Sequence, residues 1–177
     1  MLVDSTLLSV LHPRQVSQGS GFSGAAWVRW GSFSVYGVKL HLICATNGIP
    51  LSYELTSANV ADGSLAEELL TEAALGDGVA RRLLGDLAYN SKELKKALGE
   101  VGILLATERS EKRAGVRQRV EIALSSLKRV FGLGETLAST LVGLATRIAA
   151  KICAYTYAFL VNRLLGRPQG HIKELWA

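Results

Sequence analysis

Three acidic residues, far apart in the sequence, are candidates for a metal-dependent phosphoryl-transfer site. Asp4 and Asp86 each follow an apolar segment that is typical of a β-strand, and Glu121 lies in a helical pattern. Hard cations such as Mg²⁺ prefer oxygen ligands, so carboxylates of this kind can hold two ions about 3.5–4 Å apart across a phosphate. One ion would activate an attacking water or hydroxyl, and the other would stabilise the leaving oxygen. A mixed sheet crossed by a helix would bring the three carboxylates together.

Each of these residues also has a simpler interpretation. An aspartate near a strand end is more often an exposed turn residue, and a glutamate on a helix is more often solvated. The spacing from Asp86 to Glu121, 35 positions, leaves room for a helix, a strand and a connection before the helix that carries Glu121. Arg117 and Lys128 would lie on the same side of that helix as Glu121, because residues four and seven apart share a face. Both are candidates to contact a phosphate backbone.

The charge of the chain is unevenly distributed along its 177 residues, although the net charge is only +5. Residues 1–80 carry three basic and seven acidic side chains, a net charge of −4, whereas residues 81–177 carry seventeen and eight, a net charge of +9. Lys and Arg that neutralise phosphates release counterions, which generates affinity for a polyanion without reading its sequence. The second half of the chain is therefore the expected polyanion-binding half.

Cysteine content and hydropathy favour a reduced, cytoplasmic setting. The chain has two cysteines, Cys44 and Cys153, which are too few for a disulfide framework or a cysteine-based zinc site. The apolar run from Ile152 to Val161 is shorter than the ~20 residues needed to cross a bilayer. We expect a buried helix there and no membrane contact.

Strand patterns are concentrated in the first part of the chain. Residues 1–10 are predicted as a strand and residues 13–31 as a Gly/Ser-rich loop. Residues 34–46 alternate apolar and polar side chains, which predicts a half-buried strand with His41 on its polar face. Asn47-Gly48 then predicts a tight hairpin turn, because both residues tolerate positive φ, with residues 50–56 as the partner strand.

Helical patterns predominate in the rest of the chain. Helices are predicted from residue 62 to about 75, from Ser91, from about 116 to 131, and from about 136 to 165, with short strands at residues 79–84 and 102–106. This order predicts an α/β fold. It fits a ribonuclease H-like mixed sheet with an antiparallel hairpin and flanking helices, and several other mixed folds would accommodate it as well. We expect a domain over residues 1–135 and a helical extension packed on it over residues 136–177, whose apolar stripe could also support self-association.

Five segments carry a resemblance to a known family. They are Asp4-Ser5-Thr6, residues 35–41 (VYGVKLH), residues 58–62 (ANVAD), residues 85–91 (GDLAYNS) and residues 117–121 (RQRVE). In this order they resemble the catalytic domain of bacterial insertion-sequence DDE transposases, and the resemblance covers nearly the whole chain.

The resemblance implies a function and assigns roles to residues. It implies a DNA transposase that cleaves and joins DNA strands, with Mg²⁺ as the cofactor and Mn²⁺ as a substitute. Asp4, Asp86 and Glu121 would be both catalytic residues and metal ligands, and Arg117 and Lys128 would bind DNA. Partners would be the element ends, target DNA and a second copy in a homo-oligomer. The expected location is the cytoplasm, in association with the nucleoid.

Two departures from the family pattern leave alternatives open. Position 114, where many relatives have a tyrosine, is alanine, and only three residues precede Asp4. Relatives carry a long N-terminal region, so the chain is expected to be truncated and weakly active or inactive. The alternative function is a catalytically inactive remnant that only binds DNA or a full-length transposase. A generic nuclease of the same fold is a third, lesser alternative.

Overall fold

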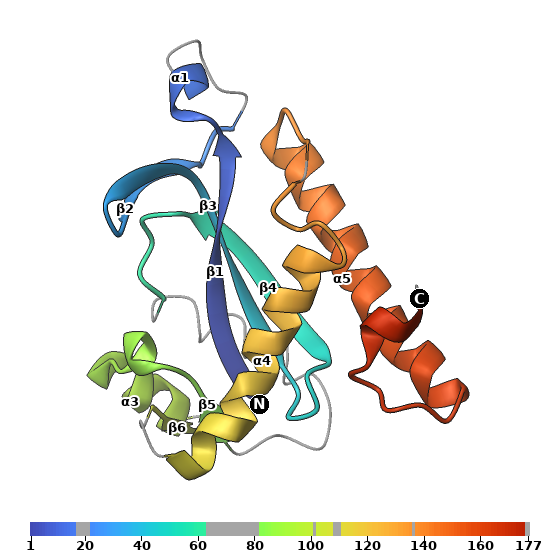
Figure 1. The fold of residues 1–177 in the computed structure, drawn as a ribbon. Coiled ribbons are helices and arrows are strands. Elements are labelled where there is room, and N and C mark those ends of the chain that lie inside the picture. Colours follow the sequence, from blue (N-terminus) through green and yellow to red (C-terminus); the bar gives the residue numbers. More distant parts are fainter. Residues whose placement is uncertain (17–21, 63–81, 101, 108–110, 136, 176–177) are drawn as a thin grey trace. The chain divides into compact units, whose positions relative to one another are not determined.

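The computed structural model describes residues 1–16, 22–62, 82–100, 102–107, 111–135 and 137–175. The predicted helix from residue 62 to about 75 lies almost entirely outside the described residues. Figure 1 gives the element labels that are used below.

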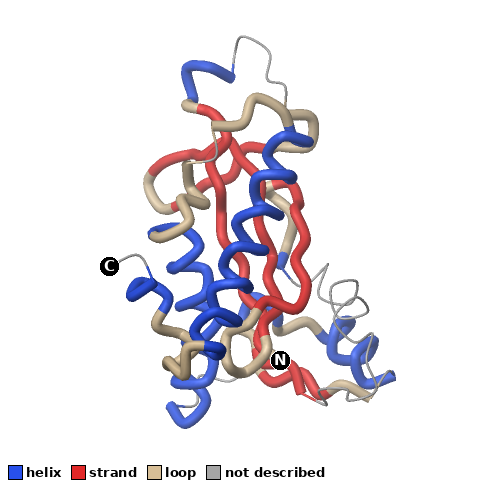
Figure 2. Tube along the Cα trace, turned by 90° about the vertical axis from the view of Figure 1, so that its right-hand side faces the viewer, coloured by secondary structure: helices blue, strands red, loops and turns tan. Residues whose placement is uncertain are grey.

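The strands form one mixed sheet. They are β1 (Leu2–Leu11), β2 (Ala26–Trp30), β3 (Phe33–Cys44), β4 (Pro50–Ser57), β5 (Arg82–Leu84) and β6 (Leu104–Ala106). The strand order is β2-β3-β1-β5-β6, and β4 pairs with β3 off this path. The long strands β1 and β3 run side by side (Figure 2). β5 pairs in parallel with both β1 and β6. The predicted α/β fold, a mixed sheet with an antiparallel hairpin and flanking helices, is confirmed.

The β3–β4 hairpin forms at the predicted turn. Gly48 has φ +92°, the left-handed conformation that glycine adopts without strain. The backbone N–H of Ala45 donates to the carbonyl oxygen of Ile49 at 2.8 Å, which closes the turn. The side-chain oxygen of Asn47 accepts from the Ile49 N–H at 3.2 Å. The local sequence was sufficient here because turn chemistry depends on adjacent residues.

The prediction of a loop over residues 13–31 was wrong in part. The structure has a short helix, α1 (Pro13–Val16), and the strand β2, which pairs antiparallel with β3 in the register Trp27 to Tyr36. The rings of Trp27 and Tyr36 lie 5.4 Å apart between centroids. Gly31, at φ +62°, makes the turn between the two strands. The glycines and serines of this region concealed a hairpin whose stability comes from cross-strand aromatic pairing.

The helices are α3 (Lys92–Glu100), α4 (Glu111–Arg129) and α5 (Leu141–Leu164), with 3₁₀ turns η2 (Leu87–Tyr89) and η3 (Ile172–Leu175). Ser91 starts α3 as predicted, because its Oγ accepts from the Leu94 N–H at 3.1 Å. Thr140 starts α5 in the same way, accepting from the Gly143 N–H at 3.1 Å. The last helix thus begins about five residues later than its apolar periodicity suggested.

The chain divides into two compact units. One comprises residues 1–5, 41–54 and 60–123, and the other comprises residues 6–40, 55–59 and 124–177. The first has ten basic and thirteen acidic residues, a net charge of −3, and the second has ten and two, a net charge of +8. We call them the acidic unit and the basic unit. The expected boundary at residue 135 between a catalytic domain and a helical extension remains a prediction.

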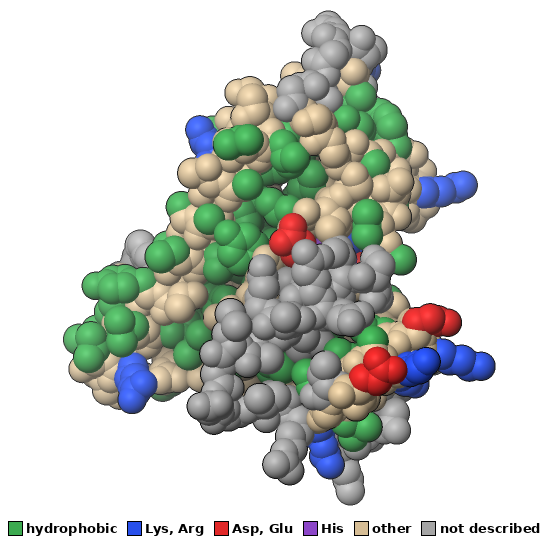
Figure 3. Space-filling view, turned by 180° about the vertical axis from the view of Figure 1, so that it is seen from behind, with side chains coloured by type: hydrophobic (Ala, Val, Ile, Leu, Met, Phe, Trp, Pro, Cys, Tyr) green, Lys and Arg blue, Asp and Glu red, His purple; other side chains and the backbone are tan. Residues whose placement is uncertain are grey.

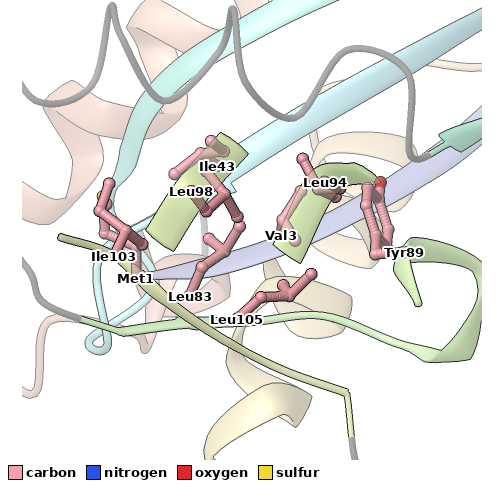
Figure 4. Close-up of a cluster of buried hydrophobic side chains, with 9 residues drawn as sticks. All are labelled: Met1, Val3, Ile43, Leu83, Tyr89, Leu94, Leu98, Ile103 and Leu105. Atoms are coloured by element: carbon pink, nitrogen blue, oxygen red, sulfur yellow. The ribbon is translucent and has the colours of Figure 1, made fainter. Parts of the chain in front are cut away.

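The acidic unit has an apolar core between α3 and the short parallel strands (Figure 4). Its members are buried side chains from β1, β3, β5, β6 and the helical segments: Met1, Val3, Ile43, Leu83, Tyr89, Leu94, Leu98, Ile103 and Leu105. Four of these residues precede Asp4 or Asp86 or lie in the turn that follows Asp86, so the core holds the candidate site residues in place.

The basic unit has its core along α5. The buried face of this helix includes Leu144, Ile148, Ile152, Tyr155 and Phe159. The helix has the length and composition of a membrane span, with a mean hydropathy of 1.3 over 18 residues, a third of which are buried. However, the Lys151 ammonium inside the helix donates to the carbonyl oxygens of Phe131 at 2.7 Å and Gly132 at 2.6 Å. A buried face and an internally bonded lysine are typical of a core helix.

Candidate active site

Strand pairing brings Asp4 and Asp86 to the same place in the sheet. β1 and β5 are parallel, and Leu2 pairs with Leu84. Asp4 and Asp86 each lie two residues beyond that pair, toward the carboxyl end. Because Asp4 and Asp86 have the same offset from paired residues of neighbouring parallel strands, the register itself places the two carboxylates near each other. The sequence predicted an aspartate after each of two apolar segments, and the strand register adds their proximity.

Asp86 is oriented by its own backbone. Its Oδ1 accepts from the Ala88 N–H at 2.8 Å, so Asp86 caps the 3₁₀ turn η2. Gly85 precedes it in a crowded position, where an added Cβ would lie 3.0 Å from Val3 Cγ1 and 3.1 Å from Tyr89 Cδ2. Glycine at this position allows β5 to approach β1 closely enough to present the carboxylate.

Glu121 lies on the α4 helix. Its neighbours Val120 and Ala123 are fully buried, which fixes the helix rotation, while Glu121 itself is exposed. Oε1 of Glu121 lies 2.8 Å from Nη2 of Arg117, one turn earlier. This ion pair is partly exposed on both sides, so its contribution to stability is small. Its effect is to hold the Glu121 carboxylate in one orientation.

Asp4 interacts electrostatically with Asp86 and with Glu121. The pKa of Asp4 is raised from 3.8 to about 6, first by burial and then by the negative charges of Asp86 and Glu121. The Ser5 N–H, which donates to Asp4 Oδ1 at 2.8 Å, and the Arg117 charge oppose this rise in the pKa. All five residues belong to the acidic unit. Carboxylates that repel one another in a partly buried site favour either a proton or a cation between them.

The carboxylates of Asp4, Asp86 and Glu121 are ligands of the kind that a divalent metal ion accepts, although their side chains do not form a complete coordination site in this structure. Among the described residues, no group of three or more His, Cys, Asp or Glu side chains is close enough to hold an ion. Oxygen-only ligands are those that Mg²⁺ and Mn²⁺ accept. The repulsion that raises the Asp4 pKa is what a cation would relieve. To bind the ion together with the two aspartates, Glu121 would have to leave its ion pair with Arg117.

Arg117 and Lys128 occupy different surroundings. Arg117 is engaged with Glu121 in the acidic unit, as described above. Lys128 belongs to the basic unit, where its Nζ donates to the carbonyl oxygen of Leu7 at 3.5 Å and burial lowers its pKa. Their role in DNA binding stays a prediction.

Sequence reasoning missed a buried polar cluster next to Asp4. Its members are Ser5, His41, Asp62 and Tyr89. The strand containing His41 was predicted to be half-buried with His41 on a polar face, and this was wrong: residues 40–44 are all 0% exposed. Both faces of β3 are covered at that point, and alternation cannot reveal a strand that is buried on both sides. A histidine flanked by two leucines in such a strand was the available signal.

Comparison with known proteins gives one clear match. Residues 1–157 match a family model described as "Transposase DDE domain". No curated protein matches the chain. A cryoEM structure of a simian T-cell lymphotropic virus intasome in complex with PP2A regulatory subunit B56 gamma is similar, with a TM-score of 0.41 and 16% identity. The match covers 72% of this chain and 45% of that one. A likeness of this size supports no conclusion about function.

Proposed function

Because the chain belongs to the transposase DDE domain family, we propose that it is the catalytic domain of a DNA transposase. It would cleave DNA and join strands by phosphoryl transfer. The observation that carries the proposal is the electrostatic interaction of Asp4 with Asp86 and Glu121, which come from three separate segments of the chain. The family match covers all three positions.

Asp4, Asp86 and Glu121 would hold divalent metal ions, with Mg²⁺ as the proposed ion and Mn²⁺ as a substitute. When bound, the ions would supply activation of the attacking oxygen and stabilisation of the leaving one. The protein's contribution is to orient carboxylates. The turn η2 orients the Asp86 carboxylate, and the Ser5 N–H orients that of Asp4. The buried face of α4 fixes the position of Glu121. Arg117, released from Glu121, would be available to a phosphate.

DNA is the proposed substrate, as element ends and as target. The basic unit, with a net charge of +8, would supply most of the affinity through phosphate contacts. On the face drawn in Figure 3, the Lys and Arg side chains of described residues are scattered among hydrophobic and polar ones. Contacts of Lys and Arg with phosphates position a protein on DNA without reading its sequence. Assembly as a homo-oligomer and location at the nucleoid in the cytoplasm belong to the same proposal.

The alternative is a chain that binds DNA or a full-length transposase without cutting. Two observations favour it: no group of three or more possible ligands among the described residues could hold an ion, and Glu121 is paired with Arg117. The two functions differ in one respect. Only the catalytic one requires a divalent ion for a covalent change in DNA.

Asp86→Asn decides between these functions. The test substrate is a supercoiled plasmid that carries the DNA flanking the coding region, incubated with Mg²⁺, Mn²⁺ or EDTA. We expect metal-dependent nicking by the unmodified chain and a loss of at least 100-fold in Asp86→Asn, because a carboxylate ligand becomes a neutral amide. Glu100→Gln, an exposed carboxylate on α3 of the same unit, is the matched control and should cleave normally. Nicking that survives Asp86→Asn would reject the assignment.

A further inference from the structure

A buried polar cluster lies directly behind Asp4. The Ser5 Oγ donates to Asp62 Oδ1 at 2.9 Å, and Nδ1 of His41 lies 4.0 Å from the same oxygen. His41 is fully buried, and the Asp62 side chain is 19% exposed. All these residues are in the acidic unit. A carboxylate so poorly hydrated is costly to bury unless hydrogen bonds and positive charge compensate it.

The cluster and Asp4 are joined through Ser5. Successive side chains of a strand point to opposite faces of the sheet, so Ser5 faces the side shared with Val3, away from Asp4. Asp62 therefore holds the Ser5 side chain on one face. The Ser5 backbone N–H donates to Asp4 Oδ1 at 2.8 Å on the other. One residue thus links two carboxylates that lie 58 positions apart in the sequence.

Tyr89 closes the cluster from the side of the apolar core. Its side chain is fully buried, and its hydroxyl lies at the margin of the apolar cluster (Figure 4). Burial, followed by the charges of Asp62 and Asp4, raises its pKa, which the Ser5 hydroxyl partly opposes. The phenol is therefore a permanent donor. Among the described residues it approaches Ser5 without completing a normal hydrogen bond. Ser5, which donates to Asp62, still has lone pairs that could accept from Tyr89.

We propose that Asp62 is a positioning residue of the transposase site: by fixing Ser5, it fixes the Asp4 carboxylate in the orientation needed to hold a metal ion. The inference rests on the proposed function, which it extends to a residue outside the three carboxylates. Partners behind a metal ligand typically change metal affinity by 10–100-fold when they are removed. Asp62 acts through hydrogen bonding, so a neutral acceptor of the same shape should replace it.

The experiment compares pairs of variants in which the second member retains the hydrogen bond. Asp62→Ala and Ser5→Ala remove it, whereas Asp62→Asn and Ser5→Thr keep an acceptor and a hydroxyl respectively. Ser9→Ala is the control on the same strand, because the Ser9 Oγ donates to the Leu11 carbonyl instead. Mn²⁺ binding is measured by calorimetry, and circular dichroism establishes that each variant is folded. If Asp62→Ala does not fold, Ser5→Ala removes the same bond.

We expect Mn²⁺ affinity to fall 10–100-fold in Asp62→Ala and Ser5→Ala and to change less than about threefold in the other variants. The double variant Ser5→Ala/Asp62→Ala should lose no more than either single one, because both remove one bond. Equal losses in Asp62→Asn and Asp62→Ala would overturn the proposal, since they would make Asp62 a ligand by its charge. Unchanged affinity in both alanine variants would overturn it as well.

A second measurement separates this proposal from the proposed function. Amide hydrogen exchange of the metal-free protein reports on the hydrogen bond that the Ser5 N–H donates to Asp4 Oδ1. We expect about tenfold faster exchange at Ser5 in Asp62→Ala, a normal rate in Asp62→Asn, and no change in Ser9→Ala. Equal rates in all variants would refute the positioning role even if the chain cuts DNA. If the unmodified chain neither binds Mn²⁺ nor nicks DNA, the proposed function fails, and the exchange rates still decide whether Asp62 fixes Asp4.

Discussion

At the scale of single residues, the most informative group is Asp4. It lies on β1 in a partly buried position, and its carboxylate interacts electrostatically with those of Asp86 and Glu121. Burial and those two charges raise its pKa to about 6 in the metal-free fold. Because a cation would relieve this repulsion, the site should favour cations. The repulsion should also lower the stability of the metal-free fold.

The pH dependence of folding tests this reading of Asp4. The pKa is 3.8 in the unfolded chain and about 6 in the folded one, so between these values the folded state binds the extra proton. The contribution of Asp4 to stability is therefore greatest below about pH 4 and decreases as the pH rises through 6. The full difference corresponds to at most about 3 kcal/mol. Asp4→Asn should match the unmodified protein at pH 4 and exceed it in stability at pH 8.

Urea unfolding in EDTA between pH 4 and pH 8 measures this effect. Glu100→Gln serves again as the exposed control. It should change the free energy of unfolding by the same small amount at pH 4 and at pH 8. A constant difference between Asp4→Asn and the unmodified protein at every pH would show that the Asp4 carboxylate is not perturbed. Mn²⁺ in place of EDTA should cancel the destabilisation at high pH, because the ion replaces the proton.

At the scale of elements, α4 and α5 show how a long helix is fixed by one polar contact. The Lys151 ammonium on α5 binds two carbonyl oxygens just beyond the end of α4, at 2.7 and 2.6 Å. Phe131 and Gly132 follow the last residue of α4, and the carbonyl oxygen of Gly132 also accepts from the Glu135 N–H at 3.0 Å. Around this contact, the ring of Tyr155 lies 5.9 Å from Phe131 and 5.2 Å from Phe159 between centroids.

Lys151→Met should destabilise the protein by about 1.5–3 kcal/mol, because it removes a charged donor from two carbonyls and keeps the apolar stem. Denaturant unfolding measures the loss. Lys173→Met, on an exposed position of η3, is the control and should change stability by less than about 0.5 kcal/mol. Equal effects of the two substitutions would mean that the contact contributes nothing to the end of α4.

At the scale of the whole molecule, folding redistributes charge. The sequence halves suggested a basic second half, but the compact units sort charge differently. The unit with the three carboxylates is acidic and the other is strongly basic, with ten Lys and Arg against two Asp and Glu. By charge, the acidic unit is thus suited to cations and the basic unit to a polyanion. Both properties are expected for metal-dependent chemistry on DNA.

Salt dependence of DNA binding measures the contribution of this charge. For a footprint of about five phosphates, the plot of log K against log salt should have a slope of roughly −4 to −5. Lys128→Gln and Arg117→Gln should each reduce the slope by about 1 and weaken binding to all sequences alike. Arg14→Gln tests whether another residue of the basic unit contributes to the slope. A slope that stays the same in both of the first two variants would remove Arg117 and Lys128 from the DNA contact.

How much the sequence could predict depended on the range of the interactions. The β3–β4 hairpin at Asn47-Gly48, the cap of α3 at Ser91 and the strand-to-aspartate segments were all predicted. Each depends on residues within a few positions of one another. The β2 strand was missed because its partner residues lie across a turn in a Gly/Ser-rich segment, where composition outweighed pattern.

By itself, the sequence determined which carboxylates could form the site and the class of fold that would carry them, because residue type and local periodicity are written directly in the chain. Only the tertiary structure decided that Asp4 and Asp86 share a register, that His41 is buried on both faces of its strand, and that Asp62 reaches Ser5. These facts depend on strand pairing, burial and contacts between residues far apart in the sequence, 57 positions for Ser5 and Asp62 and 82 for Asp4 and Asp86, which no local pattern encodes.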